Sequence, residues 1–184
     1  MLKVICVFLP VLGAWFVHVP ILRFNLFPGL RRPIDAGRTW RGRRLFGDNK
    51  TWRGALAMGG GVLGLTLLLS RSRSYWEALP VELQRRGPWI VGTLLGLGTV
   101  LAELPNSFAK RQCDIAPGQQ RRSLLGAIIS VYDQGDFVLG IWLTLLPLWV
   151  MSAQQAAVAF GVVAVVHLAV SWIAYRLGAR ATPW

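Results

Sequence analysis

The chain alternates between long apolar stretches and polar connecting segments. Five stretches are long enough, or nearly so, to cross a hydrocarbon core, which takes about 20 helical residues. They run from Val4 to Leu22, from Ala55 to Ser70, from Trp89 to Leu104, from Phe137 to Met151 and from Ala156 to Leu177. The pattern predicts an all-α, polytopic membrane bundle of five transmembrane helices, in a single domain over residues 1–184. Four spans with one re-entrant stretch are the alternative.

The first stretch has the position of a secretory signal but not its composition. It is long for the apolar region of a signal peptide, and residues 16–20 are too bulky for a small-residue cleavage site. We therefore expect it to be retained as a membrane span.

Basic residues are distributed unevenly across the predicted membrane. The net charge of the 184 residues is +12 although only 15% are charged. If the N-terminus lies outside, the loops Arg23–Arg53 and Asn106–Asp136 and the C-terminal tail hold fifteen of the 20 Lys and Arg residues. Cytoplasmic segments carry this excess, so we expect a protein of the cytoplasmic (inner) membrane with a cytoplasmic C-terminus. We then attribute the basic charge to this orientation and to attraction by anionic lipids of the bilayer, and we expect no nucleic acid as a partner.

Glycines are concentrated in the second and third apolar stretches. Gly60 and Gly64 are four residues apart, as are Gly92 and Gly96. Such pairs let membrane helices approach closely, so we expect both faces to contact other helices.

The first cytoplasmic loop ends in the polar run Asp48-Asn49-Lys50-Thr51, immediately before the second stretch. A lysine and free backbone N–H groups at a helix N-terminus favour phosphate binding. The run is not a Walker A loop, because the glycine spacing of that motif is missing. A loop that binds lipid headgroups is the alternative.

A second polar group begins at the inner end of the third stretch, where an ionisable residue is typically functional. Its members are Glu103, Asn106, Ser107, Lys110, Arg111, Asp133 and Asp136. Carboxylates suit Mg²⁺ that also binds substrate phosphates, and the basic residues would stabilise a departing pyrophosphate. A set of interfacial salt bridges that fix the bundle is the alternative.

The remaining candidate residues give weaker signals. His18 and His167 each occur singly in an apolar stretch, so we expect them to pack within the bundle and not to act in catalysis. Cys6 lies in the first stretch and Cys113 in a cytoplasmic loop, so a disulfide between them is not expected.

Two regions of the chain resemble a known enzyme family. Residues 33–35 (Pro-Ile-Asp) and 45–54 (Leu-Phe-Gly-Asp-Asn-Lys-Thr-Trp-Arg-Gly) are similar to the first cytoplasmic loop of CDP-archaeol synthases. Residues 107–111 (Ser-Phe-Ala-Lys-Arg), 117–118 (Pro-Gly) and 133–137 (Asp-Gln-Gly-Asp-Phe) resemble its second loop and a signature of the related phosphatidate cytidylyltransferases. The resemblance implies an enzyme that uses CTP, a membrane lipid phosphate and Mg²⁺ to make a CDP-lipid and pyrophosphate.

The resemblance also implies roles for individual residues. Asp133 and Asp136 would hold the metal, with Glu103 as a third candidate ligand. Lys110 and Arg111 would contact phosphates and complete the catalytic group with the two aspartates. The expected substrate-binding residues are Asp48, Asn49, Lys50, Thr51, Asn106 and Ser107.

The chain departs from the family pattern at Ala102-Glu103, where the family usually has Gly-Asp, and at Gln112, which replaces a usual base. This departure motivates the alternative of a non-catalytic lipid-binding or scaffold protein derived from the family. The sequence leaves open the lipid, of CDP-archaeol or CDP-diacylglycerol type, as well as the oligomeric state and the residues that recognise cytosine.

Overall fold

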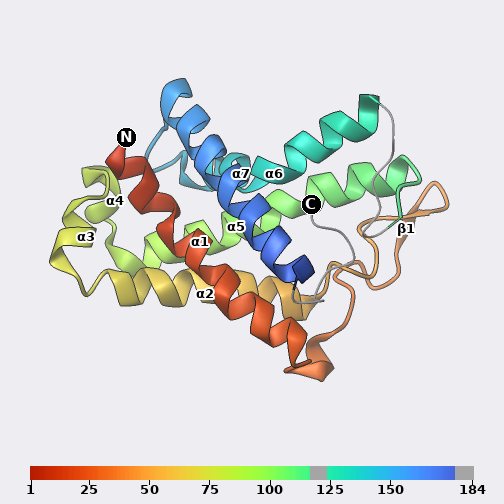
Figure 1. Ribbon diagram of the computed structural model, residues 1–184. Coiled ribbons are helices and arrows are strands. Elements are labelled where there is room, and N and C mark those ends of the chain that lie inside the picture. The colour runs from red at the N-terminus through yellow and green to blue at the C-terminus, as the bar shows by residue number, and fades with distance from the viewer. Residues whose placement is uncertain (117–123, 177–184) are drawn as a thin grey trace.

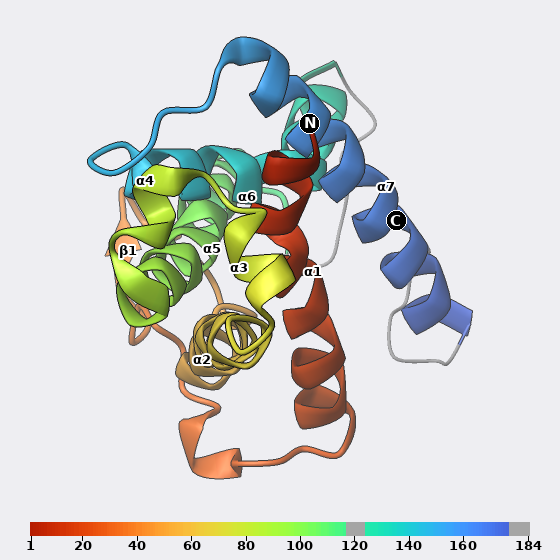
Figure 2. The ribbon, with the colours of Figure 1, turned by 90° about the vertical axis from the view of Figure 1, so that its left-hand side faces the viewer.

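The computed structural model describes residues 1–116 and 124–176 and is mostly helical. Its longer helices are α1 (Leu2–Arg23), α2 (Trp52–Leu69), α5 (Gly87–Gln112), α6 (Leu124–Leu145) and α7 (Ala153–Arg176). Its shorter elements are η1 (Pro28–Leu30), β1 (Thr39–Trp40), β2 (Arg43–Arg44), α3 (Arg73–Glu77) and α4 (Val81–Gln84). Helix α5 packs against both α2 and α6, α1 packs against α2, and α7 contacts α1 and α6 (Figures 1 and 2).

Among the described residues, four helices are long and apolar enough to cross a membrane: α1, α2, α5 and the stretch Ala153–Ile173 of α7. Helix α6 has 22 residues, within which Gly135–Leu145 forms a shorter apolar stretch. Four of the five predicted spans are therefore confirmed as helices of sufficient length. The remaining span, the fourth along the chain and located in the α6 region, stays a prediction.

Two predicted boundaries were wrong. The third span does not give way to a loop after Leu104, because α5 continues to Gln112 and carries the polar residues that follow. The fourth stretch was placed too late, since α6 begins at Leu124 and ends at Leu145. A pattern of apolar residues does not detect helical turns that consist of polar residues. The basic residues in the last turn of α5 also suit its negative end.

The turn before α7 has its own local signal. The Ser152 N–H donates to Gln155 Oε1 at 2.8 Å, and the Gln155 N–H donates to Ser152 Oγ at 3.2 Å. This reciprocal capping box satisfies two backbone donors at the start of a helix. It explains why α7 begins at Ala153, directly after the serine.

Close helix contacts occur at some of the glycines. A Cβ on Gly96 would lie 2.6 Å from the Gly59 carbonyl oxygen, so α2 and α5 touch backbone to backbone there. A Cβ on Gly98 would lie 2.9 Å from the Gly140 oxygen, which places α6 equally close on the other side of α5. The Gly92/Gly96 prediction is confirmed. The prediction for Gly60 and Gly64 was wrong, because no described atom lies within 4 Å of a Cβ at either.

The two ends of the bundle differ. Figure 1 shows the β1–β2 hairpin beside the C-terminal end of α5, with α3 and α4 at the opposite end. The connection that carries α3 and α4 is folded onto the bundle because Leu79 and Leu83 are buried. Among the described residues, the hairpin of the first loop therefore lies at the end of α5 that carries Lys110 and Arg111.

Candidate active site

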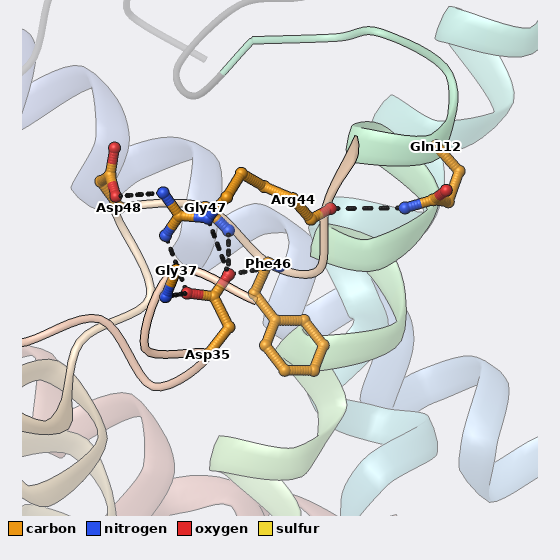
Figure 3. A network of polar contacts seen from close by, with 7 residues as sticks. All are labelled: Asp35, Gly37, Arg44, Phe46, Gly47, Asp48 and Gln112. Carbon is orange, nitrogen blue, oxygen red and sulfur yellow. Dashed lines mark hydrogen bonds and ion pairs between the residues drawn. The ribbon is translucent and has the colours of Figure 1, made fainter. Parts of the chain in front are cut away.

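Asp35 organises the first loop. Its side chain is fully buried and accepts hydrogen bonds from the N–H groups of Gly37, Phe46 and Gly47, each at 3.0 Å, and from Arg44 Nη2 at 2.7 Å (Figure 3). Burial favours the neutral acid, but these donors outweigh it and hold the pKa of Asp35 well below its usual range. The carboxylate therefore stays charged and fixes the loop.

The same loop is attached to the end of α5. Arg43 Nη1 donates to the Gln112 carbonyl oxygen at 2.6 Å, and its Nη2 pairs with Asp114 at 2.7 Å. Gln112 Nε2 in turn donates to the Arg44 carbonyl oxygen at 3.3 Å. The turn between β1 and β2 uses Arg41 and Gly42, both with positive φ, as the type I′ hairpin turn requires. The hairpin thereby joins segments about 70 positions apart.

The predicted binding run at the end of this loop divides into two parts. Asp48 points away from the site: its side chain is 74% exposed and pairs with Arg44 at 2.9 Å. Thr51 caps α2, accepting a hydrogen bond from the Gly54 N–H at 3.2 Å. Asn49 and Lys50 line a cavity, as does Thr51. The structure therefore separates Asp48 from the other three.

The cavity has a volume of about 220 Å³ and lies between α1, α2, α5 and the first loop. Its polar lining also includes His18, Thr99 and Glu103, while its apolar lining comprises Ile34, Ala55, Met58, Val100 and Leu104. The backbone holds the loop in place here, because the Ile34 N–H donates to the Lys50 carbonyl oxygen at 2.8 Å. The cavity thus has both a charged part and an apolar part.

Lys50 is paired with Glu103. The two side chains are 26% and 31% exposed. Burial opposes the charge on Lys50, but Glu103, followed by the more distant Asp136 and Asp133, raises the pKa of Lys50 above its ordinary value. The Glu103 carboxylate therefore keeps the Lys50 ammonium charged at the cavity.

A second cluster joins α5 and α6. Lys110 Nζ donates to Asp133 Oδ1 at 2.8 Å, and Asn106 Nδ2 donates to the same oxygen. Ser107 is buried on α5 at 7% exposure, next to Asn106 at 4%. Asp133 and Asp136 lie on α6, as their spacing predicts, although in the body of the helix and not before it. Two packed helices thus bring Asn106, Lys110 and Asp133 together, while Pro117-Gly118 of the predicted second loop lie outside the described residues.

Several buried polar atoms of the predicted site residues have no hydrogen-bond partner among the described residues. They are Oδ1 of Asp136, Oδ1 of Asn106, and Nε and Nη1 of Arg111. An unpartnered buried polar atom is costly, and a bound cation or phosphate would satisfy these. Oxygen donors suit a hard cation such as Mg²⁺, which typically takes one or two carboxylates together with substrate phosphates and water. In the described part of the chain, three potential ligands are nowhere grouped at metal-binding spacing. These residues would therefore fit a cation that is bound together with a phosphate ligand.

Two residues of the site were not predicted from the sequence. Asp35 belongs to the Pro-Ile-Asp motif of the first loop, but the sequence does not indicate that it is buried against Arg44, nine residues later. His18 was expected to pack, yet it lines the cavity and its Nδ1 is buried without a partner in the described structure. A single histidine in an apolar stretch carries no sequence signal of this kind.

The sequence profile of the CarS-like family, described as CDP-archaeol synthase, matches residues 1–184. The chain belongs to the CDP-archaeol synthase family. The family member from Halobacterium salinarum is 38% identical over 160 residues, which cover 83% of each chain. The member from Pyrococcus furiosus is 30% identical over 181 residues, covering 95% of this chain and 99% of the relative.

A solved structure of an intramembrane enzyme for archaeal membrane lipid biosynthesis is similar over 90% of both chains, with a TM-score of 0.63 and 25% identity. The predicted family and the predicted enzyme class, a cytidylyltransferase that makes a CDP-lipid, are therefore confirmed. The family match gives no support to the non-catalytic alternative. The chain is an integral membrane protein.

Proposed function

We propose that this chain condenses CTP with an archaeol-type lipid phosphate, giving a CDP-lipid and pyrophosphate. The observation that carries the proposal is the ion pair between Lys50 of the first loop and Glu103 of α5, the helix whose Asn106 and Lys110 contact Asp133 of α6. The family match supports CTP and the lipid phosphate as substrates. The ether-linked lipid is supported by the names of the relatives.

In the proposed reaction, an oxygen of the lipid phosphate forms a bond to the α-phosphorus of CTP. The bond from that phosphorus to the oxygen bridging the α- and β-phosphates breaks, and pyrophosphate leaves with the electron pair. Lys110, Arg111 and Lys50 stabilise the negative charge that develops on the leaving group, as preorganised cations do in phosphoryl transfer. Asn49, Asn106 and Ser107 position the substrates.

Asp133 and Asp136 would hold Mg²⁺, with Glu103 as a third candidate ligand. The unpartnered Oδ1 of Asp136 supports this assignment. When bound, the metal would neutralise negative charge on the substrate phosphates. Glu103 has a second role in the proposal, because its carboxylate holds the Lys50 ammonium at the cavity.

The proposed topology has five spans in a single domain, with α6 as the fourth span. The N-terminus lies outside the cytoplasmic membrane, and the C-terminus and active site face the cytoplasm. The concentration of Lys and Arg in the first loop, the second loop and the tail supports this orientation. Scanning accessibility of single cysteines placed in the first loop and in α3 tests it, since the two positions must label from opposite sides.

The activity is tested by incubating purified protein with CTP, Mg²⁺ and a panel of lipid phosphates that carry ether-linked isoprenoid or ester-linked acyl chains. We expect CDP-lipid and pyrophosphate in equal amounts, detected by mass spectrometry, and no product after the metal is chelated. Failure to form a CDP-lipid from any lipid of the panel, with correctly folded protein, would overturn the proposal.

A further inference from the structure

The segment immediately after α1 exposes large apolar side chains. Phe24 is 72% exposed and Phe27 is 62% exposed, with Leu26 and Leu30 at 44% and 41%. In both Figure 1 and Figure 2 the orange segment around η1 forms the lowest part of the molecule, beyond the end of α1 and away from the β1–β2 hairpin. Large aromatic side chains exposed together mark an interaction surface.

The conformation of this segment is imposed from inside the protein. Arg53, which is only 7% exposed, donates from Nη1 to Asn25 Oδ1 at 2.6 Å and to the Leu26 carbonyl oxygen at 3.4 Å. Asn25 and Phe27 have φ values of 48° and 53°. A phenylalanine in the left-handed region is strained and persists only where its surroundings over-determine it. The buried Arg53 thus fixes the two residues that lie between the exposed Phe24 and Phe27.

The charge around the segment is entirely basic. Arg23 precedes it and Arg31 and Arg32 close it, and residues 23–32 contain no acidic residue. The segment also continues directly from α1, which is a membrane-spanning helix. Aromatic side chains flanked by arginines at the end of a span are characteristic of the boundary between acyl chains and anionic headgroups. Both charge and position therefore select a lipid surface as the partner.

We infer that residues 24–32 form an interfacial anchor, in which Phe24 and Phe27 insert at the headgroup boundary and the arginines bind anionic headgroups. Arg53 lies in the first turn of α2, two residues beyond Thr51 at the cavity. Through Arg53 the anchor sets the depth of the cavity relative to the lipid headgroups. The anchor is a property of this loop and does not depend on the proposed chemistry.

A spin label at position 27 tests the anchor. Phe27→Cys is made in a chain whose Cys6 and Cys113 are replaced by alanine, labelled with a nitroxide and placed in vesicles of phosphatidylcholine and phosphatidylglycerol. We expect oxygen to relax the label efficiently. Relaxation by a water-soluble nickel complex should be weaker than at Arg38→Cys by a factor of about three or more, because the acyl boundary excludes the complex. Arg38 is an exposed residue of the same loop. Phe16→Cys, at a position 79% exposed on α1, is the control inside the membrane.

A second measurement keeps both native cysteines. Phe27 is replaced by photoreactive benzoylphenylalanine, which retains an aromatic ring, and the vesicles are irradiated. Lipid adducts at position 27, identified by mass spectrometry, support the anchor. Nickel accessibility equal to that of Arg38→Cys, or cross-links to the chain itself without lipid adducts, would overturn it.

Discussion

Lys50 and Glu103 form an ion pair between residues 53 positions apart in the sequence. The lysine ends the first loop and the glutamate lies in α5, so the pair connects the loop to the helix that carries Asn106 and Lys110. Both side chains also line the cavity. This contact, together with the pair of Lys110 and Asp133 between α5 and α6, connects the two polar regions of the chain.

Replacing Glu103 by Gln removes the charge that holds Lys50 while preserving the shape of the side chain. We expect a loss of about 1–3 kcal/mol in the free energy of unfolding, because a hydrogen bond between charged groups is lost and Lys50 remains partly buried. Thermal unfolding in detergent measures this. If Glu103 also binds Mg²⁺, the metal concentration for half-maximal activity rises in the same variant.

Glu82→Gln is the matched control, since Glu82 is an exposed residue of α4 at the opposite end of the bundle. We expect neither its stability nor its metal dependence to change measurably. An unfolding temperature for Glu103→Gln equal to that of Glu82→Gln would show that the ion pair does not stabilise the fold.

Asp136→Asn keeps the size of a buried side chain but removes its charge. We expect CDP-lipid formation to fall by a factor of about 100 or more, as expected for loss of a metal ligand or charge-stabilising group at a phosphoryl-transfer site. Folding is retained, because Oδ1 has no partner to lose among the described residues. Turnover and circular dichroism on the same preparation separate the two effects.

The exposed Asp114 provides the control for this variant. Its side chain is 69% exposed and pairs with Arg43 on the outside of the hairpin, and such exposed pairs contribute only about 0–1 kcal/mol. Asp114→Asn is expected to retain nearly full activity. Full activity in Asp136→Asn as well would remove Asp136 from the active site.

The Asp35 network predicts a pH dependence for the first loop. Because the folded-state pKa of Asp35 is lowered, its contribution to stability is complete above the ordinary carboxyl pKa of about 4 and is lost as pH falls toward the folded value. Hydrogen exchange at the Phe46 and Gly47 amides, corrected for the intrinsic effect of pH, should therefore accelerate only in strongly acidic solution.

Asp35→Asn should accelerate exchange at these amides at neutral pH, corresponding to a loss of about 1.5–3 kcal/mol in the free energy of loop opening. Asp48→Asn is the matched control, since Asp48 pairs with the same Arg44 but is 74% exposed. Equal protection in the two variants would show that Asp35 does not organise the loop.

The glycine contacts predict opposite outcomes for two substitutions on neighbouring helices. Gly96→Ala brings a Cβ to 2.6 Å from the Gly59 carbonyl oxygen, so α2 and α5 must separate. We expect a loss of about 1–3 kcal/mol in stability from this overpacking. Gly60→Ala meets no described atom within 4 Å, and we expect it to be neutral or slightly stabilising because alanine favours the helix. Unfolding temperatures of the two purified variants check this, and equal temperatures would contradict the contact.

The apolar pattern determined most of the fold without help from the structure. Stretches of about 20 apolar residues can form little else than helices in a membrane, since the backbone must satisfy its own hydrogen bonds there. The motifs at residues 45–54, 107–111 and 133–137 likewise sufficed for the family, because they combine specific charges with specific spacing. The ends of the helices were harder to predict from the sequence, as the extension of α5 to Gln112 shows.

Only the tertiary structure decided which polar residues act together. Asp48 and Lys50 are two residues apart, yet one pairs with Arg44 on the surface and the other with Glu103 at the cavity. His18 became part of the cavity because α1 packs against α2. The orientation of a side chain in a loop depends on partners distant in the sequence, here Asp35 and the end of α5. Local pattern therefore predicted which residue types form the site, and packing determined which of them meet.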